Sequence, residues 1–190
     1  IESIEAVVSC TLNYVLTTHE RPECEESLAA LLGRAQKERL SETDPRTDLG
    51  GRDVLRKLLI LAREAGVTLE EGDVQITPML GREFFDCPIE EFYSRLEALE
   101  PKIQIREKQL AAEGKRQRFV AMMRRDPSAR LGYRAEIKMV DVGADSPFYW
   151  LSGTENVTII KSEYSAPLVI RGAGEGGRLA ASGIIRDGLL

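Results

Sequence analysis

Strand patterns fill the last third of this chain, and they limit its fold more than any other feature of the sequence. Apolar and polar side chains alternate over Tyr133–Met139, which is the period of a half-buried strand. This run lies within Leu131–Val142, which is predicted to form a hairpin with Phe119–Met123 around the turn sequence Asp126-Pro127-Ser128. Further strands are predicted at Val157–Ile160 and Leu168–Ile170.

Helical patterns lie in the first two thirds of the chain. Pro22, with the acidic residues after it, predicts the start of a helix whose apolar stripe covers Leu28–Ala35. The sequence RDVLRKLLILAREAG predicts a second helix that ends at Gly66. A third helix is predicted to begin near Ile89 and to stop at Pro101, and a shorter helical piece follows it.

Short elements complete the expected order. Strands are predicted near Ile4–Val8 and Val74–Met79, with a short helix over Thr11–Thr18. Because helices come first and strands crowd at the end, the predicted fold class is α+β. We expect a mixed sheet of about five or six strands, with helices covering one face.

Composition excludes several kinds of protein. A chain of 190 residues, 43% of them hydrophobic, can bury a core without crosslinks. Three scattered cysteines and one histidine predict neither a disulfide framework nor a zinc site, so we expect no metal. No apolar run is long enough to cross a bilayer, and the start lacks the basic residues of a signal peptide. We expect a cytoplasmic protein without a membrane partner.

Because the chain begins at Ile1 inside a strand pattern, we expect it to be part of a longer protein.

Charge argues against a nucleic-acid partner. The net charge is −5, yet the segment Lys115–Arg134 holds seven lysine and arginine residues. They are interspersed with apolar residues at strand spacing, which favours a solvated sheet face over a nucleic-acid patch.

Three glycines near the end, Gly172, Gly174 and Gly177, spell the G-x-G-x-x-G of a dinucleotide-binding turn. That turn must open a strand–helix–strand unit, with an acidic residue about 20 positions further on. Only thirteen residues follow Gly177, so no second strand fits. The residues alone favour a glycine-rich link between a strand and a terminal helix.

The segment SETDPRTDLGGRDVLRK gathers the residues best suited to chemistry: Glu42, Asp44, Asp48, Asp53 and Lys57. Asp53 and Lys57 are four positions apart, so on a helix they are neighbours about 5–6 Å apart at Cβ. Spacing alone is explained by a solvated salt bridge and acidic helix caps. A carboxylate that orients a reactive ammonium is the alternative.

This segment closely resembles the signature of the homoserine dehydrogenase family, E-x-D-P-R-x-D-L-x-G-x-D-V-x-R-K. VVSCTLNYVL resembles the start of that family's substrate domain, and TENVTIIKSEYSAPLVIRG resembles its closing strands. The long helical segment EEFYSRLEALEPKIQIREKQLAAEGKRQRFVA resembles the branch fused to aspartokinase. The resemblance covers essentially the whole chain.

Membership would imply a domain organisation and a reaction. Residues 1–165 would form the homoserine-binding catalytic and dimerisation domain. Residues 166–190 would form a glycine-rich return segment and a helix that packs on a Rossmann domain absent from this sequence. The reaction would interconvert L-homoserine and L-aspartate 4-semialdehyde with NAD or NADP, which the absent domain would mainly bind. We also expect a homodimer formed through the sheet.

The resemblance further implies roles for individual residues. Lys57 would relay the proton, and Asp53 would orient it. The substrate-binding residues would be Glu42, Asp44, Asp48 and Thr11, with Glu42 and Asp48 at the substrate ammonium. Gly172 and Gly174 would approach the cofactor.

The sequence departs from the family pattern at four positions: Cys10 replaces a glycine, Leu40 a tyrosine and Thr43 a proline, and Glu175 stands inside the glycine turn. A rival interpretation, based on the alternating strand, is a dimerisation and regulatory module of a larger protein.

Overall fold

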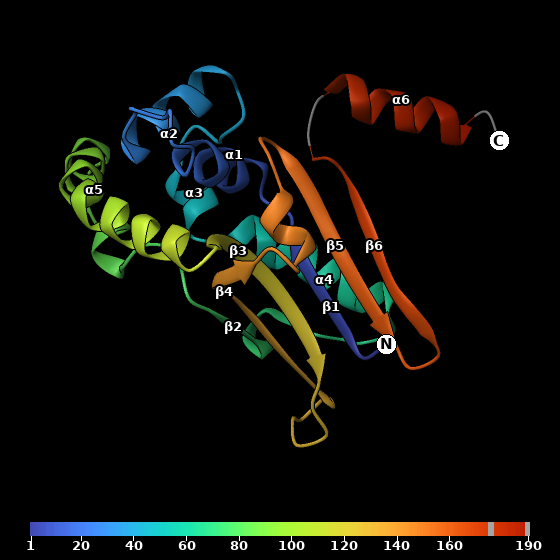
Figure 1. Ribbon diagram of the computed structural model, residues 1–190. Coiled ribbons are helices and arrows are strands. Elements are labelled where there is room, and N and C mark those ends of the chain that lie inside the picture. The colour runs from blue at the N-terminus through green and yellow to red at the C-terminus, as the bar shows by residue number, and fades with distance from the viewer. Residues whose placement is uncertain (175–176, 189–190) are drawn as a thin grey trace.

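The computed structural model describes residues 1–174 and 177–188. A six-stranded sheet forms its centre, as Figure 1 shows. The strands are β1 (Ser3–Val7), β2 (Val74–Ile76), β3 (Lys115–Arg125), β4 (Tyr133–Gly143), β5 (Glu155–Ser162) and β6 (Ser165–Ala173). Their order across the sheet is β2-β4-β3-β1-β5-β6. β2 and β4 are parallel and every other neighbouring pair is antiparallel, so the predicted mixed sheet is confirmed.

The predicted hairpin is the longest pairing of the sheet. β3 and β4 pair along their whole lengths, from Lys115 opposite Gly143 to Arg125 opposite Tyr133. A hydrogen bond from the N–H of Asp126 to the carbonyl of Gly132, at 2.8 Å, closes the turn between them.

Six helices accompany the sheet: α1 (Cys10–His19), α2 (Leu28–Lys37), α3 (Arg46–Leu49), α4 (Arg52–Glu64), α5 (Ile89–Ala112) and α6 (Gly177–Gly188). α1 and α4 pack directly on the central strands, and α2 packs on α1 and α5. In Figure 1, α6 stands apart from the other helices, beyond β6. No helix in the described part of the chain is both long and apolar enough for a bilayer.

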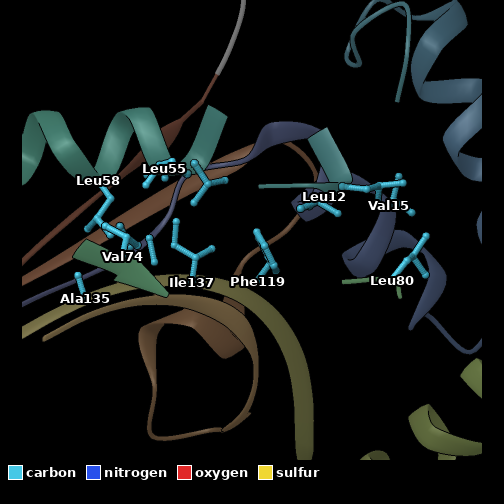
Figure 2. Packing of buried hydrophobic residues seen from close by; sticks show 14 of the residues in the cluster. Leu12, Val15, Leu55, Leu58, Val74, Leu80, Phe119, Ala135 and Ile137 are labelled. Carbon is cyan, nitrogen blue, oxygen red and sulfur yellow. The ribbon is translucent and has the colours of Figure 1, made fainter. Parts of the chain in front are cut away.

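The main core lies between these helices and one face of the sheet. Figure 2 shows Leu12 and Val15 of α1 and Leu55 and Leu58 of α4 directed toward Phe119 and Ile137 of the strands. Each of these side chains is at most 6% exposed. On the opposite face a smaller cluster packs beneath a 3₁₀ turn at Pro147–Trp150.

The start predicted for the first long helix was wrong. α2 begins at Leu28 and not at Pro22, because the Ser27 hydroxyl accepts a hydrogen bond from the Ala30 N–H at 3.1 Å. Serine is a strong N-cap, and here it outweighs the proline and acidic residues upstream. The strand predicted over Val74–Met79 is also shorter and ends at Ile76.

Pro101 does not stop its helix, which contradicts a second prediction. α5 continues through it as one 24-residue helix, although Figure 1 shows its first part end-on and its second part from the side. A proline within a helix removes one hydrogen bond and commonly causes a kink. Buried side chains on both sides of it, Phe92, Leu96 and Leu110, hold the two parts in place.

The expectation of a solvated cationic face is correct except at Arg118, which is fully buried. Its guanidinium binds both carboxylate oxygens of Glu20 at 2.8 Å and donates to the carbonyl of Phe148 at 3.0 Å. The other six cations of Lys115–Arg134 also pair with acids at partly exposed positions. A segment whose cations are already neutralised is poorly suited to bind phosphates.

Candidate active site

The turn from β1 into α1, residues 8–11, includes Thr11 and is contacted by Lys57 and Gly174. Ser9 caps α1, and its side chain accepts a hydrogen bond from the Leu12 N–H at 3.3 Å. The first N–H groups of a helix have no acceptor within the helix and carry its positive dipole end. Residues 8–11 therefore offer a carbonyl on one side and a positive helix end on the other.

Lys57 reaches this turn from α4. Its Nζ donates to the Val8 carbonyl at 2.8 Å and lies 2.7 Å from a carboxylate oxygen of Asp53. The side chains of Lys57 and Asp53 are 38% and 46% exposed, so the pair is open to solvent or a ligand. The predicted i,i+4 pair is present, and its ammonium is fixed by an additional main-chain contact.

Gly51 determines where α4 starts. Its φ of +77° lies in the left-handed region, and a Cβ there would be 3.1 Å from the Phe119 ring. Glycine is therefore required both by conformation and by space. This close fit sets the first turn of α4, and with it Asp53, against the sheet.

The acidic loop before α4 is attached to the same turn. Thr11 is buried, and its hydroxyl donates to the Leu40 carbonyl at 2.6 Å. Asp48, only 8% exposed, accepts hydrogen bonds from the Ser41 hydroxyl and the Glu42 N–H at 2.8 and 3.1 Å. The Glu42 side chain is exposed, and within the described residues its carboxylate has no hydrogen-bond or ion-pair partner.

Asp44 has a different environment from the other acids. The Arg46 guanidinium contacts both of its carboxylate oxygens at 2.6–3.1 Å. These hydrogen bonds lower the pKa of Asp44, with a smaller opposing effect of burial. Asp44 is thus neutralised by Arg46 inside the loop.

Gly172 in β6 and Gly174 just after it differ in their surroundings. A Cβ on Gly174 would approach the Asn156 amide nitrogen to 2.5 Å and the Cys10 sulfur to 2.6 Å, so Gly174 lies directly against the start of α1. Gly172 is exposed on β6, and a Cβ there would meet nothing within 4 Å. Glu175 lies outside the described residues.

Sequence reasoning missed the partners that assemble this site. They are the Val8 carbonyl, Asn156, and Asn13, which is 1% exposed and donates to the carbonyls of Gly153 and Glu155 at 2.9 Å. The Asn13 Oδ1 atom is buried and has no hydrogen-bond partner among the described residues. The contacts of Val8 and Asn13 join residues more than 40 positions apart, so no local pattern could indicate them. Among the described residues, no cluster of three or more His, Cys, Asp or Glu side chains could hold a metal.

Comparison with known proteins decides the family. A family model described as homoserine dehydrogenase matches residues 1–189. The chain belongs to the homoserine dehydrogenase family. Its resemblance to that family is therefore confirmed, as is the α+β fold.

Relatives include both fused and separate homoserine dehydrogenases. The chain is 33% identical over 190 residues to the bifunctional aspartokinase/homoserine dehydrogenase of Haemophilus influenzae, covering 98% of this chain and 22% of that protein. It is 30% identical over 200 residues to the homoserine dehydrogenase of Saccharomyces cerevisiae, covering 98% of this chain and 52% of that protein. The chain thus spans about a fifth of the first relative and about half of the second.

Solved structures share the fold. A Candida auris protein of unknown function superposes with a TM-score of 0.83 at 30% identity, covering all of this chain and 52% of that one. The homoserine dehydrogenase of S. aureus superposes with a TM-score of 0.74 at 15% identity, covering 100% of this chain and 41% of that one.

Proposed function

We propose that this chain is the catalytic domain of an NAD(P)-dependent homoserine dehydrogenase, which interconverts L-homoserine and L-aspartate 4-semialdehyde. The observation that carries the proposal is the position of Lys57, held by Asp53 and the Val8 carbonyl. Gly174 and the acidic loop join the same turn through Cys10 and Thr11. An ammonium, a carboxylate and a glycine-lined approach at one turn suit the reduction of a small amino-acid aldehyde.

Lys57 acts as the proton relay in this proposal. Its ammonium has three donors, and the described residues occupy two of them, at Val8 and Asp53. The third is available to the substrate oxygen, to which it gives a proton on reduction and from which it takes one on oxidation. Asp53 is the positioning residue that keeps Nζ at the turn.

Glu42 and Asp48 receive the substrate ammonium. Carboxylates are its natural acceptors through charge-assisted hydrogen bonds. Glu42 is exposed without a partner in the described structure, whereas Asp48 is buried and fixes the loop through Ser41. Asp44 contributes through its ion pair with Arg46, which shapes the loop. Thr11 ties this loop to the start of α1 and offers its N–H to the substrate carboxylate.

NAD or NADP supplies the hydride when bound, and residues outside this chain hold most of it. The chain's own residues suit a secondary contact, because Gly172 is exposed, a Cβ there would meet none of the described atoms within 4 Å, and Gly174 lies against the start of α1. In this proposal residues 166–190 lead back to the nucleotide-binding domain, and residues 1–165 form the substrate and dimerisation domain.

The proposed assembly is a cytoplasmic homodimer formed through the sheet. β6 is an edge strand, and Leu168, Val169 and Ile170 on it are 44–55% exposed. Apolar side chains on an open edge favour association. Light scattering that gives a single-chain mass would contradict the dimer.

The function is tested by assaying the complete protein that contains this chain. NADPH or NADH oxidation should require L-aspartate 4-semialdehyde, and the 190-residue chain alone should show no turnover because it lacks the nucleotide-binding domain. A complete protein that dimerises but has no turnover would support the regulatory-module alternative instead.

A further inference from the structure

A cavity of about 1010 Å³ lies away from the Lys57 site. It is bounded by the end of α1, the second part of α5, the segment after β2, and strands β3 and β4. Of the described residues that line it, none belongs to the set predicted for substrate, cofactor or proton transfer. Its volume is at the upper end of the range typical of small-molecule sites.

Apolar side chains form much of its lining. Leu16, Leu80 and Leu110 are each at most 6% exposed, and Ile103 and Met139 contribute from α5 and β4. Such a surface gains free energy when an apolar group displaces water from it.

Ion pairs hold the walls of the cavity in place. Glu20 lines it and is bound through both carboxylate oxygens to the buried Arg118. The guanidinium carbon of Arg116 lies 4.2 Å from the centre of the Tyr149 ring, in a cation–π contact. His19 on α1 and Glu107 on α5 both line the cavity, and the His19 Nδ1 atom lies 2.8 Å from a carboxylate oxygen of Glu107. A wall fixed by such contacts is already ordered before any ligand enters, which lowers the entropic cost of binding.

The charge of the lining is opposite to that of the chain. Seven lysine and arginine side chains line the cavity with only two glutamates, although the whole chain carries −5. Four of the seven have an acidic partner. Arg21, Lys102 and Lys108 have none among the described residues, so their charge is available to a ligand.

We propose that this cavity is a second ligand site, which binds a small organic anion with an apolar body. The apolar lining takes the body, and Lys102 and Lys108 on α5 attract the anionic group. The site is independent of the dehydrogenase reaction, so neither proposal depends on the other.

A matched pair of probes tests the proposal on the full chain. 1-Anilinonaphthalene-8-sulfonate carries a sulfonate, and N-phenyl-1-naphthylamine has the same aromatic body without the charge. For the double variant Lys102→Gln/Lys108→Gln, the Kd of the sulfonate should rise at least about fivefold, while that of the neutral probe stays within about twofold. Ile103→Ser should weaken the binding of both probes, with far-UV circular dichroism confirming that the variant is folded.

The matched control removes the same charge elsewhere. Lys37 and Arg82 are exposed, do not line the cavity and have no acidic partner among the described residues, so Lys37→Gln/Arg82→Gln should leave both affinities unchanged. An equal loss of sulfonate binding in the two double variants would show only a general charge effect and overturn the proposal. The proposal would also be overturned if the Kd of the sulfonate were the same in Lys102→Gln/Lys108→Gln as in the unaltered chain, or if the unaltered chain did not bind the sulfonate.

Discussion

The Nζ atom of Lys57 donates a hydrogen bond to the main-chain carbonyl of Val8 at 2.8 Å, and this contact joins α4 to the turn between β1 and α1. A solvated i,i+4 salt bridge needs no such contact. Because a carbonyl cannot rotate away as a side chain can, it fixes the ammonium at the turn that contains Thr11 and that Gly174 contacts. The position of Lys57 is therefore set by tertiary structure as well as by helix spacing.

The exposed carboxylate of Glu42 leads to the first prediction. If it binds the substrate ammonium, Glu42→Gln in the complete enzyme should raise KM for homoserine about tenfold while changing kcat much less, because the contact exists before and during hydride transfer. Steady-state kinetics measure both constants. An unchanged KM would assign Glu42 to loop structure only.

The chain's one histidine joins three helices. The two ring nitrogens of His19 on α1 lie 2.8 Å from Glu100 and Glu107 of α5, and Glu100 also accepts from the N–H of Leu28, the first residue of α2. A neutral imidazole can donate only one hydrogen bond, so both contacts require the imidazolium. Burial lowers the pKa of His19, but the hydrogen bonds and charges of Glu107 and Glu100 outweigh it and raise the pKa above 6.5.

The second prediction follows from the sign of this shift. A pKa raised on folding gives stability that is fully present below 6.5 and is lost as the pH rises through the folded-state value. Relative to His19→Gln, the unaltered chain should therefore be more resistant to urea at about pH 6, and this advantage should shrink by about pH 9. An advantage that is constant across this range would show that protonation of His19 does not contribute to the stability of the fold.

Gly51 gives a third prediction, on stability. Gly51→Ala should lower the free energy of unfolding by about 2 kcal/mol or more, because alanine must adopt the left-handed φ and its Cβ meets Phe119. Gly33 is the matched control: it lies inside α2 with open space around it, so Gly33→Ala should stabilise by about 0.5–1 kcal/mol. Urea unfolding curves of the two variants should shift in opposite directions, and a stability unchanged in Gly51→Ala would show that the fold relaxes around residue 51.

Local patterns predicted the elements whose signals lie within a few residues. The β3–β4 hairpin and α4 were recognised because alternation and apolar stripes are local properties. The errors arose where a packing or capping contact outweighed a residue preference, as at Ser27 and Pro101. Nothing near Arg118 in the sequence indicated that it would be buried, since its partner Glu20 is 98 positions away.

The sequence indicated the contact between Asp53 and Lys57 but not the long-range contacts around it. The Asp53–Lys57 pair followed from helix spacing, whereas its contact with Val8 spans 49 positions. The resemblance implied that Gly174 approaches the cofactor, and the structure shows a contact that was not predicted, between Gly174 and Cys10 and Asn156. The packing of α4 on the sheet creates the contact with Val8, and the pairing of β5 with β6 brings Gly174 to Asn156.

Replacing Lys57 by methionine is the most direct test of the proposed proton relay. Lys57→Met keeps most of the side-chain volume and the helix preference but removes the ammonium that contacts Val8 and Asp53. If Lys57 relays the proton, kcat of the complete enzyme should fall about 10²–10⁴-fold while cofactor affinity is unchanged. Asp53→Asn, which alters only the positioning of Lys57, should cost less. A Lys57→Met enzyme whose kcat stays within about threefold of the unaltered enzyme would contradict the proposed mechanism, because that loss is too small for a missing acid–base group.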